Sequence, residues 1–290
     1  MSDVPFQRVA LVVHPTRDID NALATLERWT DEQGLELVQL ETLGSKREVA
    51  DPGEVTAADL VVALGGDGTV LAALRAAAGT RTPVLGVACG SLGAMSAVTA
   101  EELDAALDRF RADDWTARAL PALAVASSDG EAWAVNDFVV VRHAAGQVAV
   151  DVAVDGELYV RLAGDGVIVA TPLGSSAYTM AAGGPIVVAD TPVLLCTPLA
   201  MHGGSAPALV VPADATLTVD VQPSHAGFDV EIDGRRRENA TARSYRFALK
   251  PEALHLVTFG PSGRGLTALR RRGVISDSPR IRARDRRKSA

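Results

Sequence analysis

A glycine-rich motif with one central carboxylate lies in the first quarter of the chain. Its residues are Gly65, Gly66, Asp67, Gly68 and Thr69. Glycines let the backbone approach a ligand closely, and amide groups that enter a following helix can hold phosphate oxygens. A carboxylate beside a phosphate site suits either a general base for a hydroxyl nucleophile or a magnesium contact. The plain alternative is a tight strand-to-helix turn whose aspartate faces solvent.

Several competing chemical signatures are missing from the sequence. None of the three lysines (Lys46, Lys250 and Lys288) follows a glycine-rich loop, so there is no Walker motif. No G-x-G-x-x-G fingerprint opens a strand-to-helix unit, and no serine stands in a G-x-S-x-G elbow. The histidines lack metal-ligand spacing, so we expect no structural zinc and no metal ligands from the protein. They are His14, His143, His202, His225 and His255.

Strand-like and helix-like segments alternate through residues 1–114 and predict an α/β domain of a nucleotide-binding type. Strands are expected at 8–13, 35–40, 59–64 and 82–87. The glycine-rich motif directly follows the third of these strands. Such alternation favours a parallel sheet with helices on both faces. Ligands of open α/β sheets bind outside the carboxyl ends of the strands, which is where the motif is expected to lie.

The helices of this first domain are marked by apolar spacing and by end signals. Asp18 can cap a helix whose apolar face includes Leu26 and that ends at Gly34. A second helix follows the glycine-rich motif. Thr99 and Glu102 form a capping-box pair ahead of a third helix.

Short β-rich runs separated by turn signals occupy residues 115–260 and predict a second, β-rich domain. Asp155-Gly156 and Asp233-Gly234 are hairpin-type turn pairs. One short helix is expected at 175–182. The remaining segment, 261–290, is expected to hold a helix that rejoins the first domain.

Composition and charge narrow the functional classes. The net charge of −8 divides into +8 for residues 264–290 and −16 for the rest of the chain. An acidic body argues against nucleic-acid binding, and we expect the basic tail to be a solvated extension. Two distant cysteines, Cys89 and Cys196, fit a reducing compartment. With no signal peptide and no apolar run long enough for a membrane helix, we expect a cytoplasmic protein without a membrane partner.

Further motifs, in order along the chain, resemble those of the NAD kinase family. The glycine-rich motif alone is shared with phosphofructokinases and with diacylglycerol and sphingosine kinases. The resemblance becomes specific where the chain continues with the family's later blocks. These blocks are Asn136-Asp137, Gly164-Asp165-Gly166, Thr171-Pro172-Leu173-Gly174-Ser175-Ser176-Ala177-Tyr178, Gly183-Gly184-Pro185, Thr197-Pro198 and Asp233-Gly234.

The resemblance implies an N-terminal α/β domain and a C-terminal β-sandwich domain, with NAD bound between them. It also implies transfer of a phosphoryl group from ATP or polyphosphate to the 2′-hydroxyl of the adenosine ribose of NAD. Asp67 would act as the base, beside Gly65, Gly66, Gly68 and Thr69. The dinucleotide would be held by Asn136, Asp137, Asp165, Ser175, Ser176, Ala177 and Tyr178. Asn136 and Asp137 would hold ribose hydroxyls and adenine, the 175–177 segment would meet the adenine edge, and Tyr178 would pack on the dinucleotide. Asp165 would reach the far base or amide. We also expect Mg²⁺ with ATP, and a homo-oligomer.

Three departures from the family pattern keep other functions open. Ala88 and Ala94 replace an asparagine and a phenylalanine of the family's GVNxGxLGF stretch, and Pro207 replaces an arginine. Altered acceptor preference, such as NADH or another nucleoside, is therefore an alternative. So are a same-fold kinase of another alcohol and a catalytically weak nucleotide-binding regulator.

Overall fold

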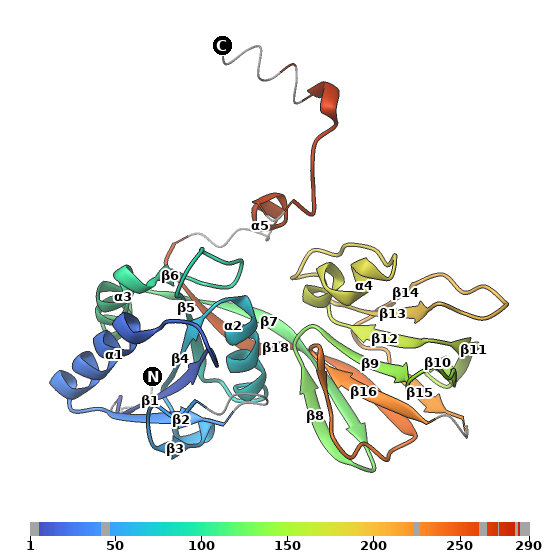
Figure 1. The fold of residues 1–290 in the computed structure, drawn as a ribbon, viewed down its shortest axis with the longest axis horizontal. Helices are drawn as coiled ribbons and strands as arrows, with labels where there is room; N and C mark the ends of the chain where they lie inside the picture. Colours follow the sequence, from blue (N-terminus) through green and yellow to red (C-terminus); the bar gives the residue numbers. More distant parts are fainter. Residues whose placement is uncertain are drawn as a thin grey trace.

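The computed structural model describes residues 6–41, 47–222, 227–260, 266–271, 273–281 and 284. Two bodies lie side by side, joined by long strands (Figure 1). Lys46, His225 and Lys288 lie outside the described residues, as does much of the basic tail.

The first body is built on a parallel sheet. Its strands are β1 (Arg8–Val13), β2 (Glu36–Leu40), β4 (Leu60–Gly65) and β5 (Pro83–Ala88), with the short strands β3 (Pro52–Gly53) and β6 (Val98–Thr99). In space the order is β3-β2-β1-β4-β5, and all of these pairs are parallel. Every residue of β4 is buried, as expected for a central strand covered on both faces. The strands predicted at 8–13, 35–40, 59–64 and 82–87 are confirmed to within a residue at either end.

Helices cover both faces of this sheet. On one face lie α1 (Asp20–Gln33) and α3 (Leu103–Arg111), which bury Leu26 and Leu107 against β1, β4 and β5. On the other face lies α2 (Asp67–Ala76), which buries Leu74 and separates the sheet from the second body (Figure 1). Short 3₁₀ turns occupy Val55–Ala57 and Ala100–Glu102.

The helix ends predicted from the sequence are confirmed in the structure. Gly34 takes the left-handed conformation after α1, and Thr99 with Glu102 forms the predicted capping box. Asp18 accepts a hydrogen bond from the amide of Asp20, although α1 itself begins at Asp20.

The second body is a sandwich of two sheets, which confirms the predicted fold class. One sheet has the order β14-β13-β12-β9-β16-β17. Its strands are β9 (Asp137–Arg142), β12 (Gly166–Ala170), β13 (Val193–Leu199), β14 (Leu209–Pro212), β16 (Phe228–Ile232) and β17 (Arg235–Arg236). The facing layer contains β7 (Thr116–Ser127), β8 (Gly130–Ala134), β10 (Val148–Val154), β11 (Glu157–Gly164), β15 (Leu217–Val221) and β18 (Ser244–Thr258). Between them lies one apolar core that includes Phe138, Tyr245 and Phe247.

Two long strands connect the sandwich to the parallel sheet. β18 pairs antiparallel with β7 and with β15, and its far end pairs parallel with β5. In β18, Phe247 lies in the sandwich core, whereas Leu254 and Leu256 lie in the core beneath α2. A register shift between Lys250 and Leu254 accompanies this change of core. The facing layer of the sandwich and the parallel sheet therefore form one continuous twelve-stranded sheet.

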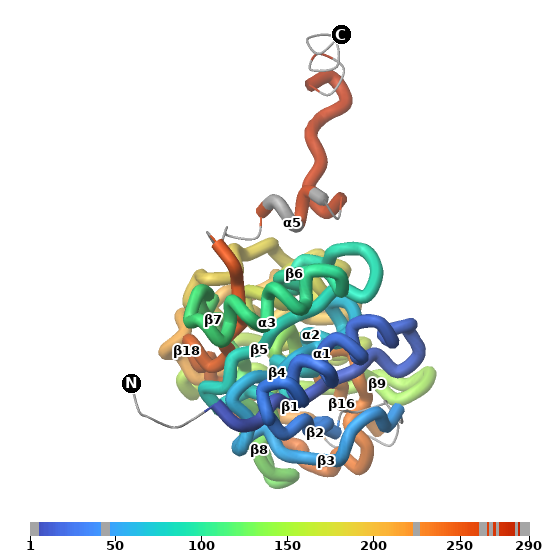
Figure 2. The backbone as a smooth tube through the Cα atoms, turned by 90° about the vertical axis from the view of Figure 1, so that its left-hand side faces the viewer, coloured from blue at the N-terminus to red at the C-terminus, as the bar shows by residue number. Residues whose placement is uncertain are grey.

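The short helices complete the described chain. A 3₁₀ turn at Leu173–Ser176 precedes α4 (Tyr178–Ala181), close to the helix predicted at 175–182. After β18 the chain forms α5 (Leu266–Arg271), and residues 273–281 then extend away from the body (Figures 1 and 2). Within the described ranges, no helix has the length and apolar character needed to cross a bilayer.

Candidate active site

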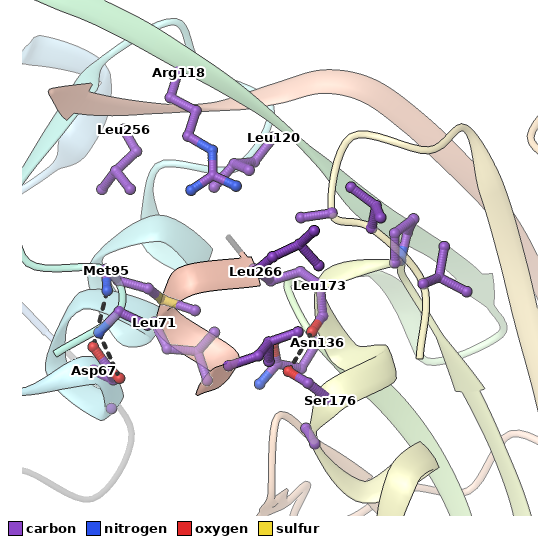
Figure 3. A pocket seen from close by; sticks show the side chains of 18 residues that line it. Asp67, Leu71, Met95, Arg118, Leu120, Asn136, Leu173, Ser176, Leu256 and Leu266 are labelled. Atoms are coloured by element: carbon purple, nitrogen blue, oxygen red, sulfur yellow. Dashed lines mark hydrogen bonds between the residues drawn. The ribbon is translucent and has the colours of Figure 1, made fainter. Parts of the chain in front are cut away.

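A cavity of about 220 Å³ lies where the two bodies meet (Figure 3). Its walls come from α2, the loop after β5, the strands β7 and β18, the loop before β9, the segment around α4, and α5. The lining residues are Asp67, Gly68, Leu71, Ala94, Met95, Arg118, Leu120, Asn136, Pro172, Leu173, Ser176, Ala177, Val187, Val188, Ala189, Leu256, Leu266 and Leu269. Five of the sequence-predicted site residues thus share one cavity: Asp67, Gly68, Asn136, Ser176 and Ala177.

Asp67 is the first residue of α2, and its carboxylate is held in place by the neighbouring loop. Its Oδ2 accepts a hydrogen bond from the amide of Ala94 at 3.1 Å, and its Oδ1 accepts one from the amide of Met95 at 3.0 Å. A methyl group at Gly93 would overlap Oδ1, so a larger residue there would displace the carboxylate. Each carboxylate oxygen has a second lone pair, so the group is fixed in orientation and still able to accept a proton.

The rest of the glycine-rich motif lies at the carboxyl ends of β1, β4 and β5. The amide of Cys89 donates to the carbonyl of Gly65, which ties the loop after β5 to the motif. Thr69 is buried and its side chain lies against Gly65. The guanidinium of Arg17 lies beside Gly66 and donates to the carbonyl of Cys89. Gly65, Gly66 and Thr69 therefore shape the loop behind Asp67 but do not line the cavity.

Asn136 is positioned by a buried aspartate from a distant turn. Asp233 accepts hydrogen bonds from the amides of Val135, Asn136 and Asp137, the shortest being 2.7 Å from Asn136. The side chain of Asp233 is fully buried and pairs at 3.2 Å with Arg75 of α2. One carboxylate thus connects the helix that begins at Asp67 to the loop that carries Asn136. From sequence, Asp233-Gly234 was interpreted only as a hairpin turn and a family block.

Asp137 lies beneath this loop rather than in the cavity wall. It is 3% exposed and is the first residue of β9. Burial, together with the negative charges of Asp233 and Glu231, raises the pKa of Asp137 to about 7, against a smaller opposing contribution from the amide of Tyr178. Its predicted contact with ribose or adenine stays a prediction.

Only some of the residues in the segment 172–178 that were predicted to bind the dinucleotide line the cavity. Ser176 and Ala177 line it, whereas the hydroxyl of Ser175 is buried and exchanges hydrogen bonds with the amide and carbonyl of Val187. This bond holds the loop that supplies the cavity residues 187–189. Gly174 packs so closely on the carbonyl of Asn136 that a side chain would overlap it.

Two further predicted residues lie outside the cavity wall. Tyr178 begins α4 and is 39% exposed. Asp165 lies between β11 and β12 and pairs with Arg142 at 2.5 Å. Contacts of Tyr178 and Asp165 with a dinucleotide stay predictions.

The three departures from the family pattern lie in different environments. Ala94 lines the cavity and uses its amide to hold Asp67. Ala88 ends β5 and lines a separate pocket of about 240 Å³ with Cys89 and Asp18. The carbonyl of Pro207 accepts a hydrogen bond from the Tyr159 hydroxyl at 2.6 Å. Ala94 is therefore the departure that directly changes the volume and the lining of the candidate site.

Several cavity residues carry no signal in the sequence. Arg118, Leu120 and Leu256 lie in the range 115–260, which was expected only to form the second domain. Leu266 and Leu269 belong to α5, a helix that was expected to rejoin the first domain, and both line the cavity. Leu266 is labelled in Figure 3. No spacing rule connects positions so distant in the chain, because only the tertiary packing of strands and helices brings them together.

Comparisons with known proteins identify the family. Residues 9–115 match the ATP-NAD kinase N-terminal domain and residues 135–255 match the ATP-NAD kinase C-terminal domain. The NAD kinase of Gemmatimonas aurantiaca is 33% identical over 237 residues, which cover 77% of this chain and 81% of that protein.

Two solved structures share the fold. The crystal structure of yeast NADH kinase complexed with NADH has a TM-score of 0.77 at 21% identity and covers 95% of this chain and 89% of its own. An NAD kinase from Archaeoglobus fulgidus, in complex with ATP, has a TM-score of 0.71 at 23% identity and covers 93% and 100%. The two domain matches and the curated relative confirm the resemblance drawn from the motifs. The chain therefore belongs to the NAD kinase family and is a kinase.

Proposed function

We propose that this protein transfers the terminal phosphoryl group of ATP to the 2′-hydroxyl of the adenosine ribose of NAD, giving NADP and ADP. The observation that carries the proposal is the cavity itself. It combines an oriented carboxylate, Asp67, with an amide side chain, Asn136, and a hydroxyl, Ser176, at the junction of the two domains. Family membership supplies the reaction class, and the cavity supplies a place for it.

Asp67 would serve as the general base. A ribose hydroxyl is a weak nucleophile at neutral pH, so its proton has to leave as the new bond to phosphorus forms. In the proposed step, the 2′-oxygen attacks the terminal phosphorus of ATP. The bond from that phosphorus to the bridging oxygen breaks, ADP leaves, and Asp67 takes the proton. The remaining contribution is positioning and charge neutralisation, as is general for phosphoryl transfer.

Other residues would orient the acceptor. Asn136 can both donate and accept hydrogen bonds, which suits a ribose diol or an adenine edge. Ser176 and Ala177 line the same side of the cavity as Asn136, where a hydroxyl and backbone groups can contact the base (Figure 3). Val187 and the leucines of β7, β18 and α5 would exclude water from the ring faces.

Magnesium, the donor and the cellular context belong to the proposal as well. We infer that Mg²⁺ enters with ATP, because Mg²⁺ in such sites is usually bound by substrate phosphates together with one or two carboxylates. Its chemistry would be to neutralise charge on the phosphates. ATP and polyphosphate both remain candidate donors of the phosphoryl group.

We further propose that the protein forms a homo-oligomer and acts in the cytoplasm. Light scattering would test the oligomeric state, and cell fractionation would test the location.

A panel of acceptors tests the proposed reaction. NAD, NADH and simple nucleosides are each incubated with ATP and Mg²⁺, and in a second arm with polyphosphate, and the products are identified by mass. NAD or NADH should gain one phosphate. Phosphorylation of another nucleoside alone would favour a same-fold kinase, for which the small Ala94 side chain in the cavity wall gives a structural reason. Binding of NAD without turnover would favour a regulator.

Asp67→Asn tests the assignment of the base. Removing the basic group should lower kcat by at least about 100-fold, or about 2.7 kcal/mol of barrier. Asparagine has one carbonyl oxygen, so it can accept from only one of the two amides that now hold Asp67, and a modest loss of stability should accompany the change. Asp214→Asn, at an exposed position, is the matched control. Unchanged kcat in a folded Asp67→Asn protein would exclude Asp67 as the base.

A further inference from the structure

Arg118 is a cation on an otherwise apolar wall of the cavity. It lies on β7 two residues before Leu120, so both side chains lie on the same face of the strand. Its partner across the strand pair is Leu256 of β18. Figure 3 shows the guanidinium between Leu120 and Leu256, directed into the space that Asp67 and Asn136 border from the other side. Of the described lining residues, Asp67 and Arg118 alone carry a charge.

The guanidinium of Arg118 forms no hydrogen bond and no ion pair with any described residue, although its side chain is partly buried. Most of the other partly buried arginines in the described chain pair with a carboxylate, for example Arg75 with Asp233 and Arg142 with Asp165. A guanidinium carries five N–H donors, and removing them from water without a partner is unfavourable. The neighbouring leucines cannot supply an acceptor. An anion brought by a ligand can.

We propose that Arg118 binds a phosphate group of the nucleotide held in this cavity. The inference rests on the proposed function, because it is that reaction which brings phosphates into the cavity. The planar guanidinium can donate two parallel N–H bonds to two phosphate oxygens, which is the geometry that distinguishes arginine from lysine. The positive charge also offsets the repulsion between those phosphates and Asp67. The phosphate can belong to the diphosphate of NAD or to the ATP donor, and the experiment separates the two.

The experiment compares Arg118→Met and Arg118→Lys with the parent protein. Methionine keeps an unbranched chain that packs against Leu120 and Leu256, so folding should be preserved. Arg246→Met is the matched control, because Arg246 is an exposed residue on β18 whose pairing partner Ala126 lies on β7. Dissociation constants are measured by calorimetry for NAD, for ATP and for adenosine, which has the base and ribose but no phosphate. Thermal unfolding verifies that each variant is folded.

In Arg118→Met, the Kd of a phosphate-bearing ligand should rise about 10- to 100-fold, as expected for loss of a charge-assisted hydrogen-bond pair. Adenosine should bind as it does to the parent. A rise for NAD alone assigns the acceptor diphosphate, and a rise for ATP alone assigns the donor. Arg118→Lys should fall between the parent and the methionine variant, because it keeps the charge and loses the planar fork.

The proposal is overturned if both NAD and ATP bind Arg118→Met within about twofold of the parent, or if adenosine binding weakens as much as theirs. It is also overturned if the parent protein binds neither nucleotide. Failure of the proposed function looks different. There, the parent would not phosphorylate NAD or NADH, while nucleotide binding would still depend on Arg118.

Discussion

Replacing Asp137 by asparagine should remove a pH-dependent loss of stability that this buried carboxylate imposes. Asp137 is 3% exposed, and burial together with the nearby charge of Asp233 raises its pKa from 3.8 to about 7. Asparagine has a similar shape and retains an oxygen that can accept from the amide of Tyr178. It cannot ionise, so it isolates the contribution of the proton.

The sign and size of the effect follow from linkage. Because the pKa of Asp137 is raised in the folded state, the protonated carboxyl contributes to the free energy of unfolding, and this contribution is fully present below about pH 4. The contribution is lost as the pH rises towards 7, because the unfolded chain releases this proton while the folded protein keeps it. The whole change corresponds to about 4 kcal/mol, of which about 3 kcal/mol falls between pH 5 and pH 8. Relative to the parent, Asp137→Asn should gain about that amount over this range.

Urea unfolding followed by circular dichroism at pH 5, 6.5 and 8 measures this difference. Asp214→Asn, at an exposed carboxylate of the same domain, is the control and should track the parent. The free-energy difference between Asp137→Asn and the parent should widen steadily with pH. A difference that stays constant to within about 0.5 kcal/mol, which is little more than a third of that expected for one pH unit, would refute the idea that Asp137 holds a proton near neutral pH.

Three further predictions concern the supports of the site and the chain end. Gly93→Ala should displace the Asp67 carboxylate and lower kcat by about 100-fold while the fold survives, since a shift of about 1 Å can cost that much; equal kcat in the two proteins would contradict the clash. Arg75→Met leaves Asp233 buried without its cation and should lower the free energy of urea unfolding by about 3–5 kcal/mol; the double variant with Asp233→Asn should recover part of this loss, and no recovery would argue against the pair. Removal of residues 274–290 should change the thermal midpoint by no more than about 2 °C and leave turnover intact, because charged termini are usually solvated; a larger drop would show that the tail packs on the body.

Local signals account for the parts of the fold that depend on neighbours in the chain. The strand 8–13, the glycine-ended helix before Gly34 and the capping box of Thr99 and Glu102 are all in place. Each depends on hydrogen bonds or side-chain spacing within one element. The strand-loop-helix arrangement around Asp67 belongs to the same class, because glycine conformation and strand polarity place the loop at a ligand-binding edge.

The long strands show where such reasoning ends. Residues 115–260 were expected to form a separate β-rich domain, yet β18 leaves the sandwich and pairs with β5 of the parallel sheet. Residues of β18 before the register shift at Lys250–Leu254 pack in the sandwich core, whereas Leu256 after it packs in the core beneath α2. No local pattern around these residues distinguishes a strand that ends in one domain from a strand that continues into the next.

By itself, the sequence determined the family, the two-part fold and the identity of the central carboxylate, because motif order and hydrophobic period can be read along the chain. The tertiary structure alone decided which side chains share a space. Arg118 and Leu256 meet through strand register. Asp233 reaches Asn136 and Arg75 across about a hundred residues or more of chain. Gly93 matters because a carboxylate from the start of α2 fills the place of its missing side chain. These contacts arise from packing between distant segments, and the residue spacing within either segment does not predict the free energy of that packing.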